Sequence, residues 1–313
     1  MANSTRVREF ILLGLTNNPQ LAIGLFLILL GIYLLTLIGN MLIIIITLVN
    51  AQLYSPMYFF LRHVAWIEIG YMSTIIPKTL INTATGSKSI TLAGCLAQMF
   101  LYFVLGTTGF LLLAVMSIDR YIAICNPLRY PAIMNEEICC LSVLCCWIGG
   151  LSLILGPSIL FFQMPYCGHN NVVNHFFCDN GHLIKLSCVD TSLLELIDFM
   201  IAVFSLLGTL VVNLVSYIKI VSTILRIPSI TGRRKTFSTC ASHMTVVFVT
   251  YSSCIFMYIR PKGSSNLDFN KITALLNTVM APLLIPFIYC LRNKQVQDAL
   301  RTELRQWVGF CKR

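Results

Sequence analysis

Three groups of residues carry side chains capable of chemistry within otherwise apolar sequence. Asp119 and Arg120 form an acid–base pair at the end of a long uncharged run, and Glu68 is a lone acid embedded in another run. The third group consists of the cysteines Cys95, Cys167, Cys178 and Cys188. An ionised group in apolar surroundings is costly unless it is paired or hydrated, so the charged residues are candidate functional sites.

The four cysteines favour a structural role. An even number of cysteines in an oxidising compartment indicates two disulfides, although counting alone leaves three connectivities open. His169, His175 and His182 lie among them, so a metal site is the alternative. Because no C-x-x-C or H-x-x-x-H pair is present, we expect no metal ion. We interpret this stretch as a loop that disulfides hold over the end of the protein.

The composition shows what kind of elements must position these groups. Of the 313 residues, 57% are hydrophobic and only 11% are charged, and the mean hydropathy is +0.81. Soluble chains carry roughly a quarter charged residues. A lipid bilayer is the solvent that tolerates so much outward-facing hydrocarbon, which excludes soluble, disordered and collagen-like proteins. The sequence therefore predicts an all-α membrane protein.

Seven segments match the length of about 20 apolar residues that a spanning helix needs. Six contain no Asp, Glu, Lys or Arg: residues 21–49, 92–118, 138–162, 199–218, 237–259 and 272–291. The seventh, residues 57–81, is weaker because Arg62, His63 and Glu68 interrupt it. Pro282 and Pro286 in the last span are tolerable if neighbouring helices bind the carbonyls they free.

The distribution of basic residues supports seven spans and sets the orientation. Thirteen Lys and Arg residues fall on the C-terminal side and seven on the other, with Arg62 and Lys78 left uncounted. The positive-inside rule then places the C-terminus in the cytoplasm and the N-terminus outside. The formal charge of +10 is thus explained without nucleic acid. Asn3 begins the chain's only N-x-Ser/Thr sequon and is a candidate glycosylation site in the outer tail.

We expect one domain, residues 1–313, with an extracellular tail (1–21), a helix bundle (22–291) and a cytoplasmic tail (292–313). No cleaved signal peptide is recognisable. In the cytoplasmic tail, four apolar residues are spaced three or four apart among basic ones: Val296, Leu300, Leu304 and Trp307. This spacing predicts a short amphipathic helix at the membrane surface.

Five motifs follow one another over residues 10–294: FILLGLT (10–16), PMYFFL (56–61), MSIDRYIAICNPLRY (116–130), KTFSTCASH (235–243) and PFIYCLRNK (286–294). In sequence and in order they resemble the motifs of the vertebrate olfactory receptors, a branch of the rhodopsin-like G-protein-coupled receptors. The resemblance implies an odorant receptor, not an enzyme, that activates a stimulatory, olfactory-type G protein and raises cyclic AMP. It also implies the plasma membrane of olfactory neuron cilia, no cofactor, and the disulfide pairs Cys95–Cys178 and Cys167–Cys188.

The resemblance further implies a switch at the cytoplasmic face, in which Arg120 pairs with Asp119 at rest and turns toward Tyr217 when active. A lipid-facing interfacial anchor is the alternative for these residues. The residues assigned to activation and G-protein contact are Asp119, Arg120, Tyr121, Tyr217, Arg233, Arg234, Lys235 and Tyr289.

A ligand wall is predicted in the outer halves of spans three, five, six and seven. Tyr251, Cys254, Ile255 and Tyr258 recur at helical spacing, which as a bare pattern more often reflects helix packing. The family's odorant site adds Phe103, Gly106, Thr107, Ser205 and Thr278. Such a pocket suits a small, volatile, mainly apolar molecule.

Glu68 leaves alternatives open. The family usually has Asp there, with a Glu in span three and an Asn before the last proline, where this chain has Gly109 and Ile285. With two of three polar partners missing, we do not expect a bound sodium ion. A transporter or channel using Glu68 is the competing function, but it would need inverted repeats or more embedded charges.

Overall fold

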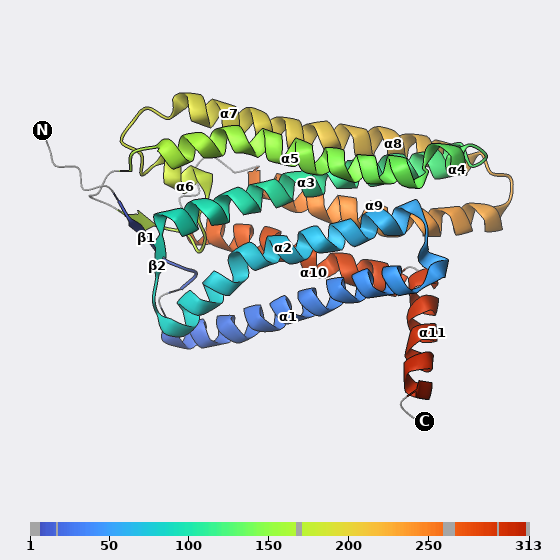
Figure 1. Ribbon diagram of the computed structural model, residues 1–313, viewed down its shortest axis with the longest axis horizontal. Coiled ribbons are helices and arrows are strands. Elements are labelled where there is room, and N and C mark those ends of the chain that lie inside the picture. The colour runs from blue at the N-terminus through green and yellow to red at the C-terminus, as the bar shows by residue number, and fades with distance from the viewer. Residues whose placement is uncertain (1–6, 17, 167–170, 259–266, 293, 311–313) are drawn as a thin grey trace, which may run out of the picture.

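The structure is a computed structural model that describes residues 7–16, 18–166, 171–258, 267–292 and 294–310. It is a bundle of long helices with a small sheet at one end (Figure 1). The long elements are α1 (Pro19–Val49), α2 (Pro56–Thr85), α3 (Leu92–Cys125), α5 (Glu136–Gln163), α7 (Ser192–Val203) continued through the π-turn η2 (Phe204–Gly208) into α8 (Thr209–Leu225), α9 (Ile230–Tyr258), α10 (Leu267–Arg292) and α11 (Lys294–Phe310). Short helices are η1 (Ala51–Leu53), α4 (Tyr130–Ile133) and α6 (Asn180–Ile184).

Local sequence sets the helix ends. The Asn18 side chain accepts a hydrogen bond from the Gln20 amide at 3.0 Å, directly before Pro19 at the first helical position. Thr91 caps α3 in the same way by accepting from the Gly94 amide at 3.1 Å. At the other end of α2, Gly86 has φ +70°, a left-handed conformation that glycine adopts without a steric penalty.

The weakest predicted span, in α2, is a continuous helix packed between α1 and α3. Within the described residues, five helices are long and apolar enough to cross a membrane, and α2 and α9 are not among them. Helix α9 carries the predicted sixth span, and its described side chains include an apolar stretch over Cys240–Ile255. The Ser and Thr hydroxyls of this helix bond back to its own backbone, as Thr245 does to Ala241 at 2.7 Å.

Helices α1 and α10 meet at a proline. Pro286 has no amide hydrogen, so the Pro282 carbonyl one turn earlier has no donor within α10. The buried Asn40 amide of α1 donates to that carbonyl at 3.2 Å. Gly39 allows this approach, because a Cβ there would lie 3.0 Å from Pro286. A neighbouring helix thus satisfies the freed carbonyl, as predicted for a bilayer helix.

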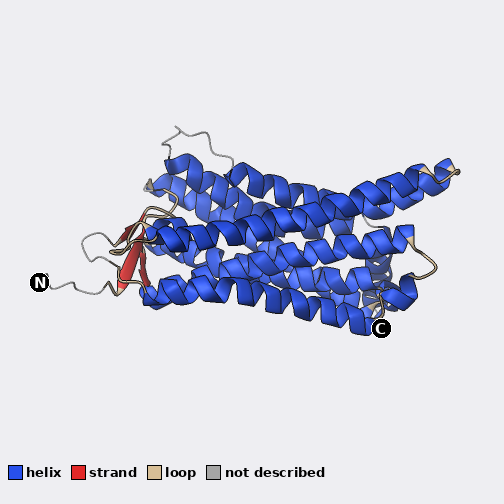
Figure 2. Cartoon of the chain, turned by 90° about the horizontal axis from the view of Figure 1, so that it is seen from above, coloured by secondary structure: helices blue, strands red, loops and turns tan. Residues whose placement is uncertain are grey.

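A three-stranded sheet covers the outer end of the bundle, opposite α11 (Figure 2). Strand β1 (Glu9–Leu12) pairs antiparallel with β2 (Ser89–Thr91) and parallel with β3 (Val172–Val173). Phe10 and Leu12 are fully buried beneath it. Part of the predicted extracellular tail is therefore a strand whose alternate side chains belong to the outer core.

At the inner end, α11 runs across the direction of the other helices (Figure 1). Its residues Val296 and Ala299 are buried in the core of the bundle. Tyr58 donates to Gln295 at 2.7 Å, and Asn50 donates to Glu303 at 3.3 Å. The predicted amphipathic C-terminal helix is confirmed.

Candidate functional site

A cavity of about 160 Å³ lies inside the bundle, between α2, α3, α5, α6, α7, η2, α9 and α10. Five of the predicted ligand residues line it: Phe103, Gly106 and Thr107 on α3, Ser205 on η2 and Cys254 on α9. The Ser205 hydroxyl donates to the Ile201 carbonyl at 2.7 Å, within the wider turn of η2. The structure therefore brings these five residues to one cavity.

Three other predicted ligand residues do not line the cavity. Tyr251 is buried and donates to Thr209 at 2.6 Å while accepting from Asn213 at 3.1 Å, so it ties α9 to α8. Thr278 is fully buried and donates to a carbonyl of its own helix, and Ile255 is not among the lining residues. Tyr258 is in α9, but its side chain is outside the described part of the chain.

On α10, Asn277 lines the cavity in place of Thr278. Its Oδ1 accepts from the Ser253 hydroxyl at 2.9 Å and from the Cys254 thiol at 3.4 Å. Of these two adjacent polar residues, the structure thus places Asn277 at the cavity and not the predicted Thr278, because the sequence does not fix the rotation of α10.

Two acids line the cavity, although the sequence indicated one. Glu68 of α2 is there, and so is Asp198 of α7, which accepts from the Asn180 amide at 2.9 Å. Asp198 was missed because it precedes by one residue the predicted start of its span at Phe199. The helix begins earlier, at Ser192, and carries this carboxylate into the bundle.

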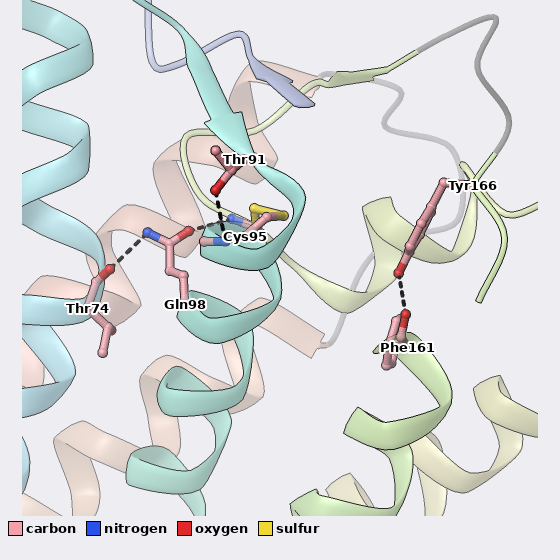
Figure 3. The surroundings of a disulfide bond; sticks show 8 residues. Thr74, Thr91, Cys95, Gln98, Phe161 and Tyr166 are labelled. Carbon is pink, nitrogen blue, oxygen red and sulfur yellow. Dashed lines mark hydrogen bonds between the residues drawn. A yellow bond between two sulfur atoms is a disulfide. The ribbon is translucent and has the colours of Figure 1, made fainter. Parts of the chain in front are cut away.

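The loop over the cavity is fixed by a disulfide and a buried glutamine (Figure 3). Cys95 of α3 is bonded to Cys178, which confirms that predicted pair. Gln98, one turn further along α3, donates to the Thr74 carbonyl at 2.8 Å and accepts from the Cys178 amide at 3.0 Å. Cys188 is also disulfide-bonded, while Cys167 lies outside the described residues. The loop is thus held to α3 by two bonds, and the same glutamine joins α3 to α2.

The histidines of this loop do not gather metal ligands. His182 Nδ1 lies 3.3 Å from Asp179 Oδ2, and the rings of His175 and His182 are 5.0 Å apart. Burial by itself raises the pKa of the Asp179 carboxyl, but the hydrogen bond from His182 and the charges of both histidines lower it overall. No group of three potential metal ligands occurs among the described residues, and His169 is outside them.

At the inner end of α3, Asp119 and Arg120 form a buried ion pair, with Arg120 Nε 2.9 Å from Asp119 Oδ2. The Tyr130 hydroxyl of α4 donates to the other carboxylate oxygen at 2.8 Å. Burial and the adjacent Asp119 charge raise the pKa of Tyr130, so its phenol stays protonated and remains a donor. Sequence reasoning missed Tyr130 because it lies outside the helix that carries the pair.

The predicted partner of Arg120, Tyr217, is held elsewhere: its hydroxyl is hydrogen-bonded to His243 Nδ1 on α9. Tyr289 is fully buried, and its hydroxyl has no hydrogen-bond partner within the described residues. Lys219 lies 5.6 Å over the Tyr121 ring.

The basic run before span six is on the first turns of α9. Arg233 donates to the Ile227 carbonyl at 3.2 Å, and Arg234 is exposed. The Lys235 side chain is outside the described part of the chain.

Comparison with known proteins decides the family. The model of a family described as olfactory receptor matches residues 29–306. The chain belongs to the olfactory receptor family. It is 56% identical to olfactory receptor 6E1 of Mus musculus over 99% of both chains, and 47% identical to olfactory receptor 6C75 of Homo sapiens over 98% of both.

The crystal structure of squid rhodopsin is similar in fold, with a TM-score of 0.69 and 14% identity, covering 94% of this chain and 88% of the rhodopsin. This olfactory receptor is therefore a seven-transmembrane, multi-pass protein of the plasma membrane and not an enzyme. Helix α2, which Arg62 and Glu68 make too polar to qualify by composition, and helix α9 are both spans of that fold. Its partners are an odorant and a G protein.

Proposed function

We propose that this olfactory receptor binds a small, volatile, mainly apolar molecule in the cavity and activates a stimulatory, olfactory-type G protein that raises cyclic AMP. The observation that carries the proposal is the cavity beneath the disulfide-bonded loop, lined by Phe103, Gly106, Thr107, Ser205 and Cys254. A largely apolar cavity with a few polar groups is typical of small-molecule sites.

The cytoplasmic contacts support a resting state. Arg120 is bound by Asp119, and Tyr217 is bound by His243, so neither is available to the other. Ligand binding shifts the equilibrium toward a state in which Arg120, Tyr217 and Tyr289 rearrange. The G protein then contacts the opened face, next to the basic run of residues 233–235.

The test is a cyclic AMP reporter in transfected cells exposed to a chemically diverse odorant panel. We expect a response that Arg120→Ala abolishes at unchanged surface expression. Arg8→Ala is the matched control, because Arg8 is an exposed arginine beside the outer sheet. Cells without stimulatory G-protein α subunits should give no signal.

The same cells separate this function from transport or conduction. A transporter or channel using Glu68 would carry ligand or ion flux that survives Arg120→Ala and disappears in Glu68→Gln. A cyclic AMP response retained in Arg120→Ala would contradict the proposed mechanism.

A further inference from the structure

The charge of the cavity restricts what can bind there. Glu68 and Asp198 both line it, and no Lys, Arg or His is among the described residues of its wall. His182, on the same short helix α6 as Asn180, is paired with Asp179 instead. The cavity is therefore acidic, without a compensating cation in the described wall.

The outer part of the cavity also has more acceptors than donors. The side-chain amide of Asn180 donates a hydrogen bond to Asp198 Oδ2. The Oδ1 atom of Asn180 is buried with no hydrogen-bond partner in the described structure. The second oxygen of Asp198 receives no hydrogen bond from any described residue and is free to bind a ligand. A buried acceptor without a donor, such as Asn180 Oδ1, costs free energy that a ligand carrying donors can recover.

The two acids lie at different depths. Asp198 is six residues from the start of α7, about 9 Å along the helix. Glu68 is 17 residues from the outer end of α2, about 25 Å along it. A ligand that enters from outside meets Asp198 first. Asp198 and Asn180 therefore form the anchor, the pair of residues that binds the polar group of the ligand, and Glu68 lines the inner part of the cavity.

We propose that the cavity recognises a primary or secondary alkyl amine, with the ammonium group bound by the Asp198 carboxylate and the Asn180 carbonyl oxygen. An ammonium group supplies both the missing charge and the missing donors. Its hydrocarbon part packs against Phe103, Phe110 and Leu206, which line the same cavity. The inference rests on the ligand site of the proposed function and narrows the class of ligand.

The test measures binding without a G protein. Purified full-length receptor is titrated with butylamine, hexylamine, octylamine and cyclohexylamine, each beside the alcohol of the same carbon skeleton, and the thermal unfolding midpoint is followed. Ligands that bind the folded state raise this midpoint with concentration. We expect the amines to bind wild type about 10- to 100-fold more tightly than their alcohols.

Substitutions assign that preference to the anchor. Asp198→Asn should remove the amine preference and leave alcohol binding unchanged, whereas Asp198→Glu should retain it. Glu195→Gln is the matched control: Glu195 lies on the same helix but is exposed and outside the cavity. Asn180→Ala supplies a second variant that keeps the carboxylate, and it should weaken amine binding several-fold.

The proposal is overturned if no amine of the series raises the midpoint of wild type, if amines and alcohols bind equally, or if Asp198→Asn leaves the amine preference intact. The reporter assay separates this result from the proposed function. Amine binding without cyclic AMP would refute the proposed coupling alone. Cyclic AMP in response to alcohols, with amines inert, would refute amine recognition alone.

Discussion

Tyr130→Phe tests the resting state by removing a single oxygen atom. The substitution removes the hydroxyl that donates to Asp119 Oδ1 at 2.8 Å and keeps the ring in place. Asp119 is fully buried, so the oxygen left without a donor cannot recover a hydrogen bond from bulk water. Arg120 remains bound to the other carboxylate oxygen. The ion pair therefore loses the hydrogen bond that it receives from α4.

The size of the effect follows from the kind of bond. Hydrogen bonds to charged groups contribute about 1.5–3 kcal/mol. Because Tyr130 is itself partly exposed, the lower limit of about 1.5 kcal/mol applies. If the bond exists only in the resting state, its loss lowers the ratio of resting to active receptor about tenfold.

The assay is the basal cyclic AMP signal at matched surface expression, without odorant. We expect Tyr130→Phe to raise it about tenfold while the resting state dominates. Tyr54→Phe is the control, because the Tyr54 hydroxyl is on an exposed residue and donates to a backbone carbonyl. An unchanged basal signal would show that both states keep the bond, and the reasoning would be refuted.

Three further predictions concern stability, measured as the unfolding midpoint of purified receptor. Asn40→Ala should cost about 1–3 kcal/mol, because it leaves the Pro282 carbonyl without its donor, and a midpoint equal to wild type would contradict this. Gln98→Leu should cost at least as much, since two buried bonds are lost; hydrogen exchange of the outer loop should rise with it. Asp179 has a lowered pKa, so its contribution is complete above its ordinary value of 3.8 and is lost as the pH falls below that value through the folded pKa. The midpoint difference between wild type and Asp179→Asn should therefore be present at about pH 5 and shrink below about 4, and a difference already lost at about pH 5 would refute the assignment.

Much of the fold was predictable because bilayer physics acts on local composition. Uncharged runs of the required length located most of the helices, and the imbalance of Lys and Arg set the orientation. The polar span is harder to predict, because Arg62 and Glu68 interrupt the apolar sequence of α2. The prediction of that helix depended on the distribution of Lys and Arg and on the family motifs, and not on hydropathy.

The candidate site was predicted in part, and the errors share a cause. Gln98 and Tyr130 are ordinary polar residues whose importance comes from partners 80 and 11 residues away. The prediction missed Asp198 because the predicted span begins one residue after it. It missed Asn277 because it selected the adjacent Thr278. Sequence periodicity gives the face of a helix to within about one residue, but a binding site depends on which of two neighbours points inward.

The contacts between α8 and α9 suggest where ligand binding and G-protein contact are linked. Tyr251 binds Thr209 at an outer contact, and His243 binds Tyr217 at an inner one. Eight residues separate the two contacts on each antiparallel helix, about 12 Å. Cys254, which lines the cavity, is three residues beyond the outer contact on α9. In the proposed mechanism, a ligand that moves α9 therefore acts on the outer contact first, and the inner contact must break before Tyr217 can reach Arg120.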